Sequence, residues 1–262
     1  METKPVIEVR NVTIQFGSLK ANSDVSFSVR QGELFGLIGP NGAGKTTMFN
    51  AMTGSVTPTQ GDILFDGKSV LKKRADEICK MGISRTYQNI RLFPQMTVEE
   101  NVEIGLHAVP QYSRLAAFLG LPVVKRTERE TKQRAREFLN RFGLLDKQDM
   151  KAGSLPYAMQ RKLEIARALA TSPKFLLLDE PAAGMNNDEC NELVALLQQV
   201  HQDFHMTTLL IEHHMDLVAS LCDKLCVLNL GKVLRQGTPS QVQKDPEVIQ
   251  AYLGDRRRKR YE

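Results

Sequence analysis

The stretch LFGLIGPNGAGKT, residues 34–46, joins an apolar run to a glycine-rich turn. Residues 34–38 carry no polar side chain, and such a short continuous run predicts a strand that is buried on both faces. Residues 39–46 then fit the pattern G-x-x-x-x-G-K-[ST] at every fixed position. Residues 46–52 predict a helix. A strand, a glycine-rich turn and a helix in this order are the setting that the pattern requires for a phosphate-binding loop.

The residue types in this loop suit a nucleoside triphosphate with its magnesium ion. Glycines let the backbone turn tightly and approach the phosphates, so that N–H groups point inward. The helix after the loop directs the positive end of its dipole at the same anion. Lys45 is expected to reach the β- and γ-phosphates, and the Thr46 hydroxyl to bind Mg²⁺. The residues expected to contact ATP here are Gly39, Pro40, Asn41, Gly42, Ala43, Gly44, Lys45, Thr46 and Thr47.

A second apolar run, FLLLDE at residues 175–180, ends in two acids. The run predicts a buried parallel strand, whose carboxyl end is the edge where α/β proteins bind ligands. Asp179 is expected to hold Mg²⁺, directly or through water. Glu180 is expected to take a proton from the attacking water. Together with the loop at 39–46, this run predicts an enzyme that hydrolyses ATP.

Length and composition are compatible with one large or two modest globular domains. The chain has 262 residues, of which 42% are hydrophobic and 25% charged. No apolar run reaches the 18 or so residues that a membrane span needs. The N-terminus, METKP, lacks the basic and then apolar pattern of a secretory signal. The chain is therefore expected to stay in the cytoplasm unless a partner holds it at a membrane.

The four cysteines and the basic C-terminus are each open to a plain interpretation. Cys222 and Cys226 are spaced C-x3-C, but no second pair completes a zinc site. With Cys79 and Cys190, they are expected to be reduced, mostly packed thiols. The run RRRKR at 256–260 contributes to the net charge of +5 and is typical of a solvated tail. Contact of this tail with anionic lipid or nucleic acid remains an alternative.

Strand and helix patterns alternate at both ends of the chain but not in the middle. Strands are predicted at 6–14, 25–29, 34–38, 63–65, 175–178, 207–211, 225–230 and 233–234, and helices at 46–52, 160–170, 189–200 and 215–222. Residues 97–150 have a helical pattern, opened by Thr97 and Glu100 at capping-box spacing. The segment 110–122 predicts a loop with a short helix. This order predicts a parallel-rich α/β core with a helical insertion.

These motifs together resemble the ATP-binding cassette of ABC transporters, over nearly the whole chain. The resemblance is carried by the phosphate loop, the run LLLDEP at 176–181, the helical block and a histidine after a later strand. It implies a P-loop (RecA-like) ABC ATPase core with an inserted helical subdomain and an antiparallel β portion. The implied core comprises 1–92 and 160–236, the helical subdomain 93–159, and a C-terminal helical segment with the basic tail 237–262.

The resemblance assigns roles to residues that the patterns alone leave open. Gln88, in SRTYQ, matches the loop that touches Mg²⁺ or water and signals to the membrane subunit. His213 matches the switch that contacts the γ-phosphate, although His214 stands where the family often has aspartate. Phe16 matches the aromatic residue that stacks on adenine, with a core or edge-strand role as the alternative. Asn186 matches the loop that crosses to the opposite site, with helix capping as the alternative.

The signature segment departs from the family pattern. The common form is LSGGQ, whereas residues 155–160 read LPYAMQ. The helix that follows matches well, but the loop lacks the serine hydroxyl and both glycines. Pro156 and Tyr157 fit the form found in subunits that import branched-chain amino acids. Ala158 and Met159 do not fit it.

Further segments resemble the same importing group: the run SRTYQNIRLF at 84–93, the insertion near 108–130, the stretch PAAGMN at 181–186 and the ending VIQAYLG at 248–254. This group implies integral membrane permease subunits as partners and a second ABC ATPase that forms a heterodimer with this chain. It also implies an indirect link to a binding protein, no nucleic acid, and a peripheral place on the cytoplasmic face of the inner membrane. The alternatives are uptake of urea or short amides, lipopolysaccharide export, and a soluble nucleic-acid-associated ATPase.

Overall fold

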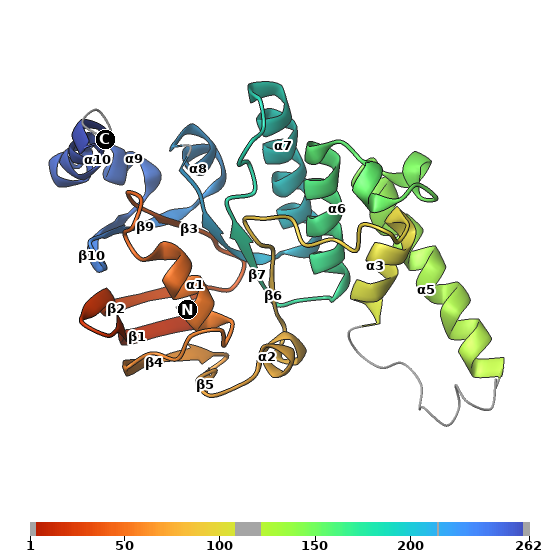
Figure 1. Cartoon of the computed structure of the whole chain (residues 1–262), viewed down its shortest axis with the longest axis horizontal. Helices are drawn as coiled ribbons and strands as arrows, with labels where there is room; N and C mark the ends of the chain where they lie inside the picture. Colours follow the sequence, from red (N-terminus) through yellow and green to blue (C-terminus); the bar gives the residue numbers. More distant parts are fainter. Residues whose placement is uncertain (1–3, 108–121, 214, 259–262) are drawn as a thin grey trace. The chain divides into compact units, whose positions relative to one another are not determined.

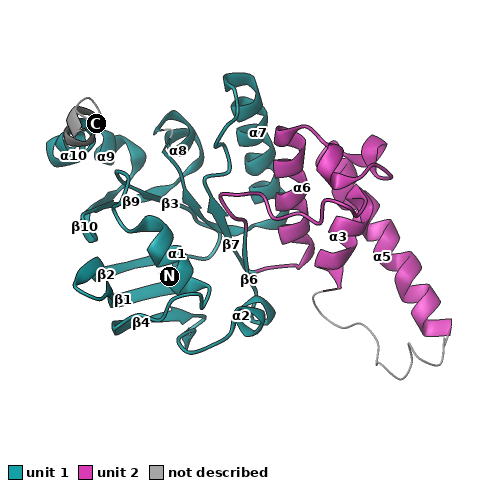
Figure 2. Ribbon diagram, in the orientation of Figure 1, with its two compact units in different colours: residues 1–85, 174–262 teal, residues 86–173 magenta. Residues whose placement is uncertain are grey.

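The structure, a computed structural model, describes residues 4–107, 122–213 and 215–258 (Figure 1). Of the segment 110–122, where a loop and a short helix are expected, residues 110–121 lie outside the described residues, and Pro122 begins a helix. His214 and the end of the basic run also lie outside them. The chain forms two compact units, one of residues 1–85 and 174–262 and the other of residues 86–173 (Figure 2). The subdomain bounds expected from the resemblance, 93–159, stay a prediction.

A six-stranded sheet forms the centre of unit 1, in the order β10-β9-β3-β8-β7-β6. The strands are β3 (Leu34–Ile38), β6 (Ile83–Arg85), β7 (Phe175–Asp179), β8 (Thr207–Ile211), β9 (Lys224–Asn229) and β10 (Lys232–Gly237). The pairs within β9-β3-β8-β7-β6 are parallel, and every residue of β3, β7 and β8 is buried. This burial on both faces explains their continuous apolar runs. The predicted terminal hairpin is confirmed as β9 and β10, which pair antiparallel.

A second sheet in unit 1 is four-stranded and antiparallel, in the order β2-β1-β4-β5. The strands are β1 (Pro5–Phe16), β2 (Leu19–Arg30), β4 (Gln60–Phe65) and β5 (Lys68–Ser69). The first two are longer than the predicted runs at 6–14 and 25–29. They meet in a tight hairpin, where Gly17 adopts a φ of 58° and Phe16 pairs with Leu19. Cross-strand pairing therefore extends both strands through polar residues that have no alternating pattern.

Six helices are described in unit 1: α1 (Lys45–Met52), α2 (Ala75–Met81), α7 (Asn187–Phe204), α8 (Met215–Leu221), α9 (Pro239–Gln243) and α10 (Pro246–Arg258). Local capping sets the start of α7, because the Asn186 side chain accepts a hydrogen bond from the Glu189 amide at 3.0 Å. The Glu189 carboxylate in turn accepts a hydrogen bond from the Asn186 amide, which completes a capping box. The predicted helix at 189–200 is thus confirmed and is longer at both ends.

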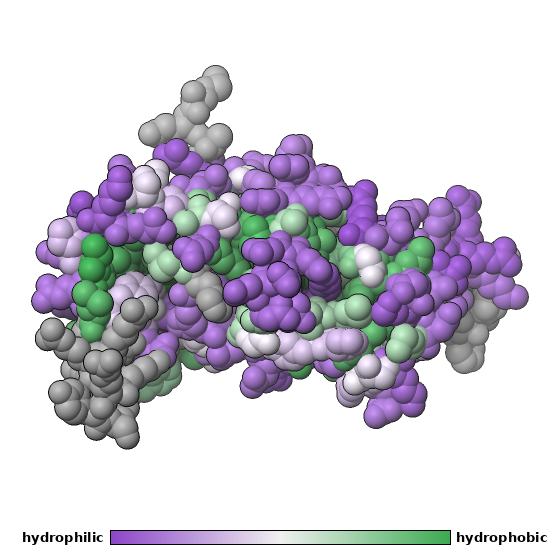
Figure 3. Space-filling view, turned by 90° about the horizontal axis from the view of Figure 1, so that it is seen from above, coloured by the Kyte–Doolittle hydropathy of each residue, from purple (hydrophilic) through white to green (hydrophobic). Residues whose placement is uncertain are grey.

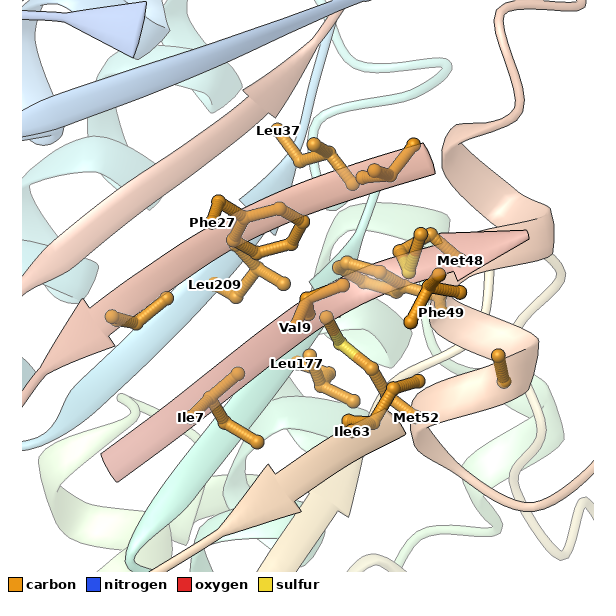
Figure 4. Packing of buried hydrophobic residues seen from close by; sticks show 14 of the residues in the cluster. Ile7, Val9, Phe27, Leu37, Met48, Phe49, Met52, Ile63, Leu177 and Leu209 are labelled. Carbon is orange, nitrogen blue, oxygen red and sulfur yellow. The ribbon is translucent and has the colours of Figure 1, made fainter. Parts of the chain in front are cut away.

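The main core of unit 1 lies between the two sheets and around α1 (Figure 4). Phe27 of β2 stacks on Phe35 of β3, with 5.5 Å between ring centroids. Met48, Phe49 and Met52 of α1 are fully buried in the same cluster. Each fully buried side chain of this size contributes roughly 1.5–3 kcal/mol through burial. This packing anchors α1 and so holds the loop in front of it.

Unit 2 contains the predicted helical block. Its described helices are α3 (Val98–Leu106), α5 (Pro122–Arg141) and α6 (Tyr157–Ala170), with short 3₁₀ turns at Leu145–Lys147 and Ala152–Ser154. The predicted capping box is confirmed, because Thr97 and Glu100 each bond to the other's backbone amide. Helix α6 begins three residues before its predicted start at 160. Pro156 explains this early start, because it fixes the extended residue before the first turn.

Among residues 4–107, 122–213 and 215–258, every helix falls short of the length and hydropathy that a membrane span needs. Figure 3 shows one face of the chain, on which hydrophilic side chains predominate and hydrophobic ones lie in patches between them.

Candidate functional site

The loop between β3 and α1 depends on glycines at defined places. Gly39, Gly42 and Gly44 have φ angles of 147°, 75° and 96°, a region that residues with a Cβ rarely adopt. A Cβ on Gly44 would lie 2.4 Å from the carbonyl oxygen of Ala21 in β2. A Cβ on Gly39 would lie 2.0 Å from the carbonyl oxygen of Leu228 in β9. The loop is therefore closely enclosed by the strands on either side of it.

Lys45, the first residue of α1, is held against the loop that precedes it. Its side chain is buried, and its ammonium donates to the carbonyl oxygens of Gly39 at 2.7 Å and Pro40 at 3.0 Å. The Thr46 side chain is exposed and that of Thr47 is half-buried. A largely desolvated cation, a helix N-terminus and a nearby hydroxyl are thus combined in one loop. This combination suits an anion that carries several charges.

Asp179 ends β7 in a buried ion pair that the sequence patterns do not indicate. Arg85, the last residue of the adjacent strand β6, donates to its carboxylate at 2.7 Å, and both side chains are at most 5% exposed. The same guanidinium donates to the Asn50 side chain at 2.8 Å and to the Thr53 hydroxyl at 3.2 Å. Arg85 therefore joins β6, β7 and α1. A carboxylate and a hydroxyl are hard oxygen ligands, so Asp179 and Thr46 fit Mg²⁺ chemically.

Glu180 and His213 meet beyond the carboxyl ends of two neighbouring strands. Strands β7 and β8 are parallel, with Asp179 opposite Ile211, so the chain leaves both strands at the same edge. Glu180 adopts a φ of 47°, and its amide donates to the Ile211 carbonyl oxygen at 2.9 Å. Glu180 Oε1 lies 2.5 Å from His213 Nε2. These side chains are 13% and 37% exposed, so the pair can be reached from solvent.

Glu212 is a further residue of this site that the sequence analysis does not single out. It is 1% exposed and lies directly after β8. One carboxylate oxygen accepts from the Ala182 amide at 2.8 Å, and the other accepts from the His213 amide at 2.9 Å. The sequence carries one signal for Glu212: the apolar run TTLLIE at 207–212 ends in an acid, as does the run that ends in Asp179 and Glu180.

Phe16 lies at the exposed end of the β1–β2 hairpin, where its side chain is 51% exposed. The β9–β10 turn links β2 to the phosphate loop: Gly231 accepts from the Ser23 amide at 2.7 Å and donates to the Ala43 carbonyl oxygen at 3.2 Å. An exposed aromatic ring such as that of Phe16 can stack on a planar base. Asn186 acts as the cap of α7, which was the alternative considered for it.

Gln88 and the signature segment belong to unit 2. Arg161, which is fully buried, donates to the carbonyl oxygens of Tyr87 at 2.6 Å and Gln88 at 2.7 Å. It also pairs with Glu164 at 2.7 Å. The side chain of Gln88 is exposed. The backbone around Gln88 is thus held to α6, whereas Lys45, Asp179, Glu180 and His213 all belong to unit 1.

Comparison of the sequence with known proteins finds matching families and relatives. The family described as ABC transporter matches residues 22–183, and the family described as branched-chain amino acid ATP-binding cassette transporter matches residues 233–257. The chain is 42% identical over 253 residues to the high-affinity branched-chain amino acid transport ATP-binding protein BraF of Pseudomonas aeruginosa. It is 41% identical over 253 residues to LivG, the corresponding protein of Escherichia coli. Each alignment covers 97% of this chain and 99% of the relative.

Solved structures are similar over the same extent. A nucleotide-free ATP-binding cassette from an ABC transporter has a TM-score of 0.82 at 32% identity and covers 95% of this chain and 99% of its own. An ATP-binding cassette in its ADP conformation has a TM-score of 0.83 at 32% identity, with coverage of 96% and 100%. The expected α/β cassette fold is therefore confirmed.

Proposed function

The chain belongs to the ABC transporter family of ATP-binding proteins, and we propose that it powers an importer of branched-chain amino acids. The observation that carries the hydrolysis of ATP in this proposal is the contact between Glu180 and His213 at the sheet edge that follows two buried parallel strands. ATP hydrolysis needs a proton acceptor at such an edge. The family match at residues 233–257 favours the importer over urea uptake, lipopolysaccharide export and a nucleic-acid-associated ATPase.

Binding of ATP begins at the loop 39–46. Its amides and the N-terminus of α1 would face the phosphates, and the Lys45 ammonium would exchange the carbonyl oxygens of Gly39 and Pro40 for the β- and γ-phosphates. The gain is large because this cation is already desolvated in the free protein. Phe16 would stack on the adenine ring.

Mg²⁺ would be held by the Thr46 hydroxyl and by Asp179, with the side chain of Gln88 as a further ligand. When bound, it supplies positive charge that offsets the charge of the phosphate oxygens. Arg85 holds the Asp179 carboxylate in place through their ion pair before any nucleotide is present.

Hydrolysis would rest on Glu180 as the general base. Its carboxylate would accept a proton from the attacking water while the oxygen of that water bonds to the γ-phosphorus. The bond from this phosphorus to the β,γ-bridging oxygen would break, so that ADP and phosphate are the products. His213 would donate from Nε2 to Glu180 and so orient the carboxylate, and it would also contact the γ-phosphate of bound ATP. Positioning and electrostatic stabilisation account for most of the catalysis in phosphoryl transfer.

The partners in this proposal are integral membrane permease subunits and a second ABC ATPase, at the cytoplasmic face of the inner membrane. The relatives carry the words "amino acid transport ATP-binding protein", which imply a transport system around this subunit. A binding protein would contact the permease and not this chain. Nucleic acid has no part in it.

The test is to tag the full chain, solubilise membranes in mild detergent and identify what co-purifies. Reconstituted in vesicles with a binding protein for leucine, isoleucine or valine, the complex should take up that amino acid only with Mg²⁺ and ATP. Lys45→Ala should weaken ATP binding and stop uptake, and EDTA should stop it in the unaltered complex. Uptake of urea but of no branched-chain amino acid, or co-purification without any membrane protein, would contradict the proposal.

A further inference from the structure

Strands β7 and β8 end side by side, and the two segments that leave them need a link beyond the sheet. The last pair in the register is Asp179 with Ile211, and Glu180 makes one further backbone bond to Ile211. From there the ladder stops, because the left-handed conformation of Glu180 turns the chain away from the strand direction. The residues that follow each strand must therefore be held by other groups.

The Glu212 carboxylate supplies that link. One oxygen accepts from the Ala182 amide, two residues after Glu180, and the other accepts from the amide of His213 itself. Both bonds are charge-assisted, and the carboxylate is 1% exposed, so water does not compete with them. One side chain thus fixes the backbone on both sides of the contact between Glu180 and His213.

We infer that Glu212 is the positioning residue that sets the distance between Glu180 and His213. The inference rests on the proposed function, since it needs those two residues to act in hydrolysis. Glu212 itself meets neither nucleotide nor water in this role. Its carboxylate keeps the distance between the segment 180–186 and the residues that follow β8 constant. Glu180 Oε1 therefore stays within hydrogen-bonding distance of His213 Nε2.

Glu212→Gln removes half of this link while keeping the shape of the side chain. The amide has one oxygen, so it can accept from only one of the two backbone N–H groups, and its NH₂ group faces the other donor. ATP hydrolysis by the tagged, co-purified complex should fall about tenfold or more, as expected for hydrogen bonds to a charged group. The affinity of the chain for ATP should change less than about twofold, because the loop 39–46 is unaltered.

The control and the double variant separate positioning from simple loss of stability. Asp223 lies directly before β9, at the amino ends of the parallel strands and so away from Glu180. Its carboxylate accepts from the Leu34 amide at 2.8 Å. Asp223→Ala removes this backbone-to-carboxylate bond, and it should lower the unfolding temperature without slowing hydrolysis. His213→Ala should slow hydrolysis, and Glu212→Gln added to it should slow it no further, because residues that act as a unit are not additive.

Two outcomes would overturn the inference: normal hydrolysis by Glu212→Gln, or losses that multiply in the double variant. Failure of the proposed function would look different. In that case Glu180→Gln and His213→Ala would themselves hydrolyse ATP at the normal rate.

Discussion

Arg85 and Asp179 form an ion pair at 2.7 Å in which both side chains are almost wholly buried. The pair joins the ends of two neighbouring strands, and Arg85 also bonds to Asn50 and Thr53 in and next to α1. The helix that carries the phosphate loop and the acid expected to hold Mg²⁺ are therefore held by one guanidinium. A pair of this kind combines a structural role with the correct placement of two functional elements.

Arg85→Met should lower the free energy of unfolding by about 3–5 kcal/mol, because it leaves a buried carboxylate without its partner. Urea denaturation of the nucleotide-free chain, followed by circular dichroism, measures this. Adding Asp179→Leu should recover much of the loss, since the uncompensated charge is then gone. The matched control is Arg126→Met, which breaks an exposed pair with Glu130 and should leave the midpoint nearly unchanged. An unaltered midpoint for Arg85→Met would contradict this account.

Substitutions at two glycines of the phosphate loop distinguish the energetic cost of backbone strain from the cost of a steric clash. Gly42 and Gly44 both have positive φ angles, but a Cβ on Gly42 would meet nothing within 4 Å. Gly42→Ala should therefore cost only the conformational strain, about 1–2 kcal/mol. Gly44→Ala should cost more, because its Cβ would lie 2.4 Å from the Ala21 carbonyl oxygen. Chemical denaturation without nucleotide compares the two, and equal losses would mean that β2 yields to the added methyl group.

Thiol reactivity reports on the sheet of unit 1. Burial raises the pKa of both Cys222 and Cys226 to about 12, so at pH 8 almost none of either is present as the reactive thiolate. At pH 9 these two should stay unlabelled by iodoacetamide, whereas the half-buried Cys79 is within reach of the reagent and should be labelled. Mass spectrometry of digested samples locates the label. Labelling of Cys222 or Cys226 in the native chain at the rate found in urea would contradict the fold.

The signature segment predicts an asymmetric dimer. Pro156 lies at the cap of α6 and offers neither a hydroxyl nor an N–H group to a phosphate, and Ala158 adds a Cβ where the family has glycine. A homodimer would contain two such segments, whereas a heterodimer with a standard partner would complete the site built on this chain's phosphate loop. Light scattering should therefore find the isolated chain largely monomeric with ATP, even as Glu180→Gln. A tight ATP-dependent homodimer with full hydrolysis in the unaltered chain would refute the asymmetry.

Much of this architecture was predictable because its signals are local. The apolar runs before residues 39 and 179, the glycine positions and the capping box at Thr97 depend on neighbours in the sequence. The elements that escaped prediction depend on contacts between distant segments. The pair of Arg85 with Asp179 and the bond from Ala182 to Glu212 arise only when segments far apart in the chain lie together. The full length of the β1–β2 hairpin depends on pairing across its turn, which the alternation of residue types does not indicate.

The central claim, that Glu180 acts as the base in ATP hydrolysis, is tested most directly by Glu180→Gln in the assembled complex. The amide keeps the size of the side chain and leaves Asp179 and Lys45 in place, but it accepts no proton. The account predicts that the variant binds Mg²⁺-ATP as tightly as the unaltered complex and hydrolyses it about 10²–10⁴-fold more slowly. Hydrolysis by Glu180→Gln at the normal rate would contradict it.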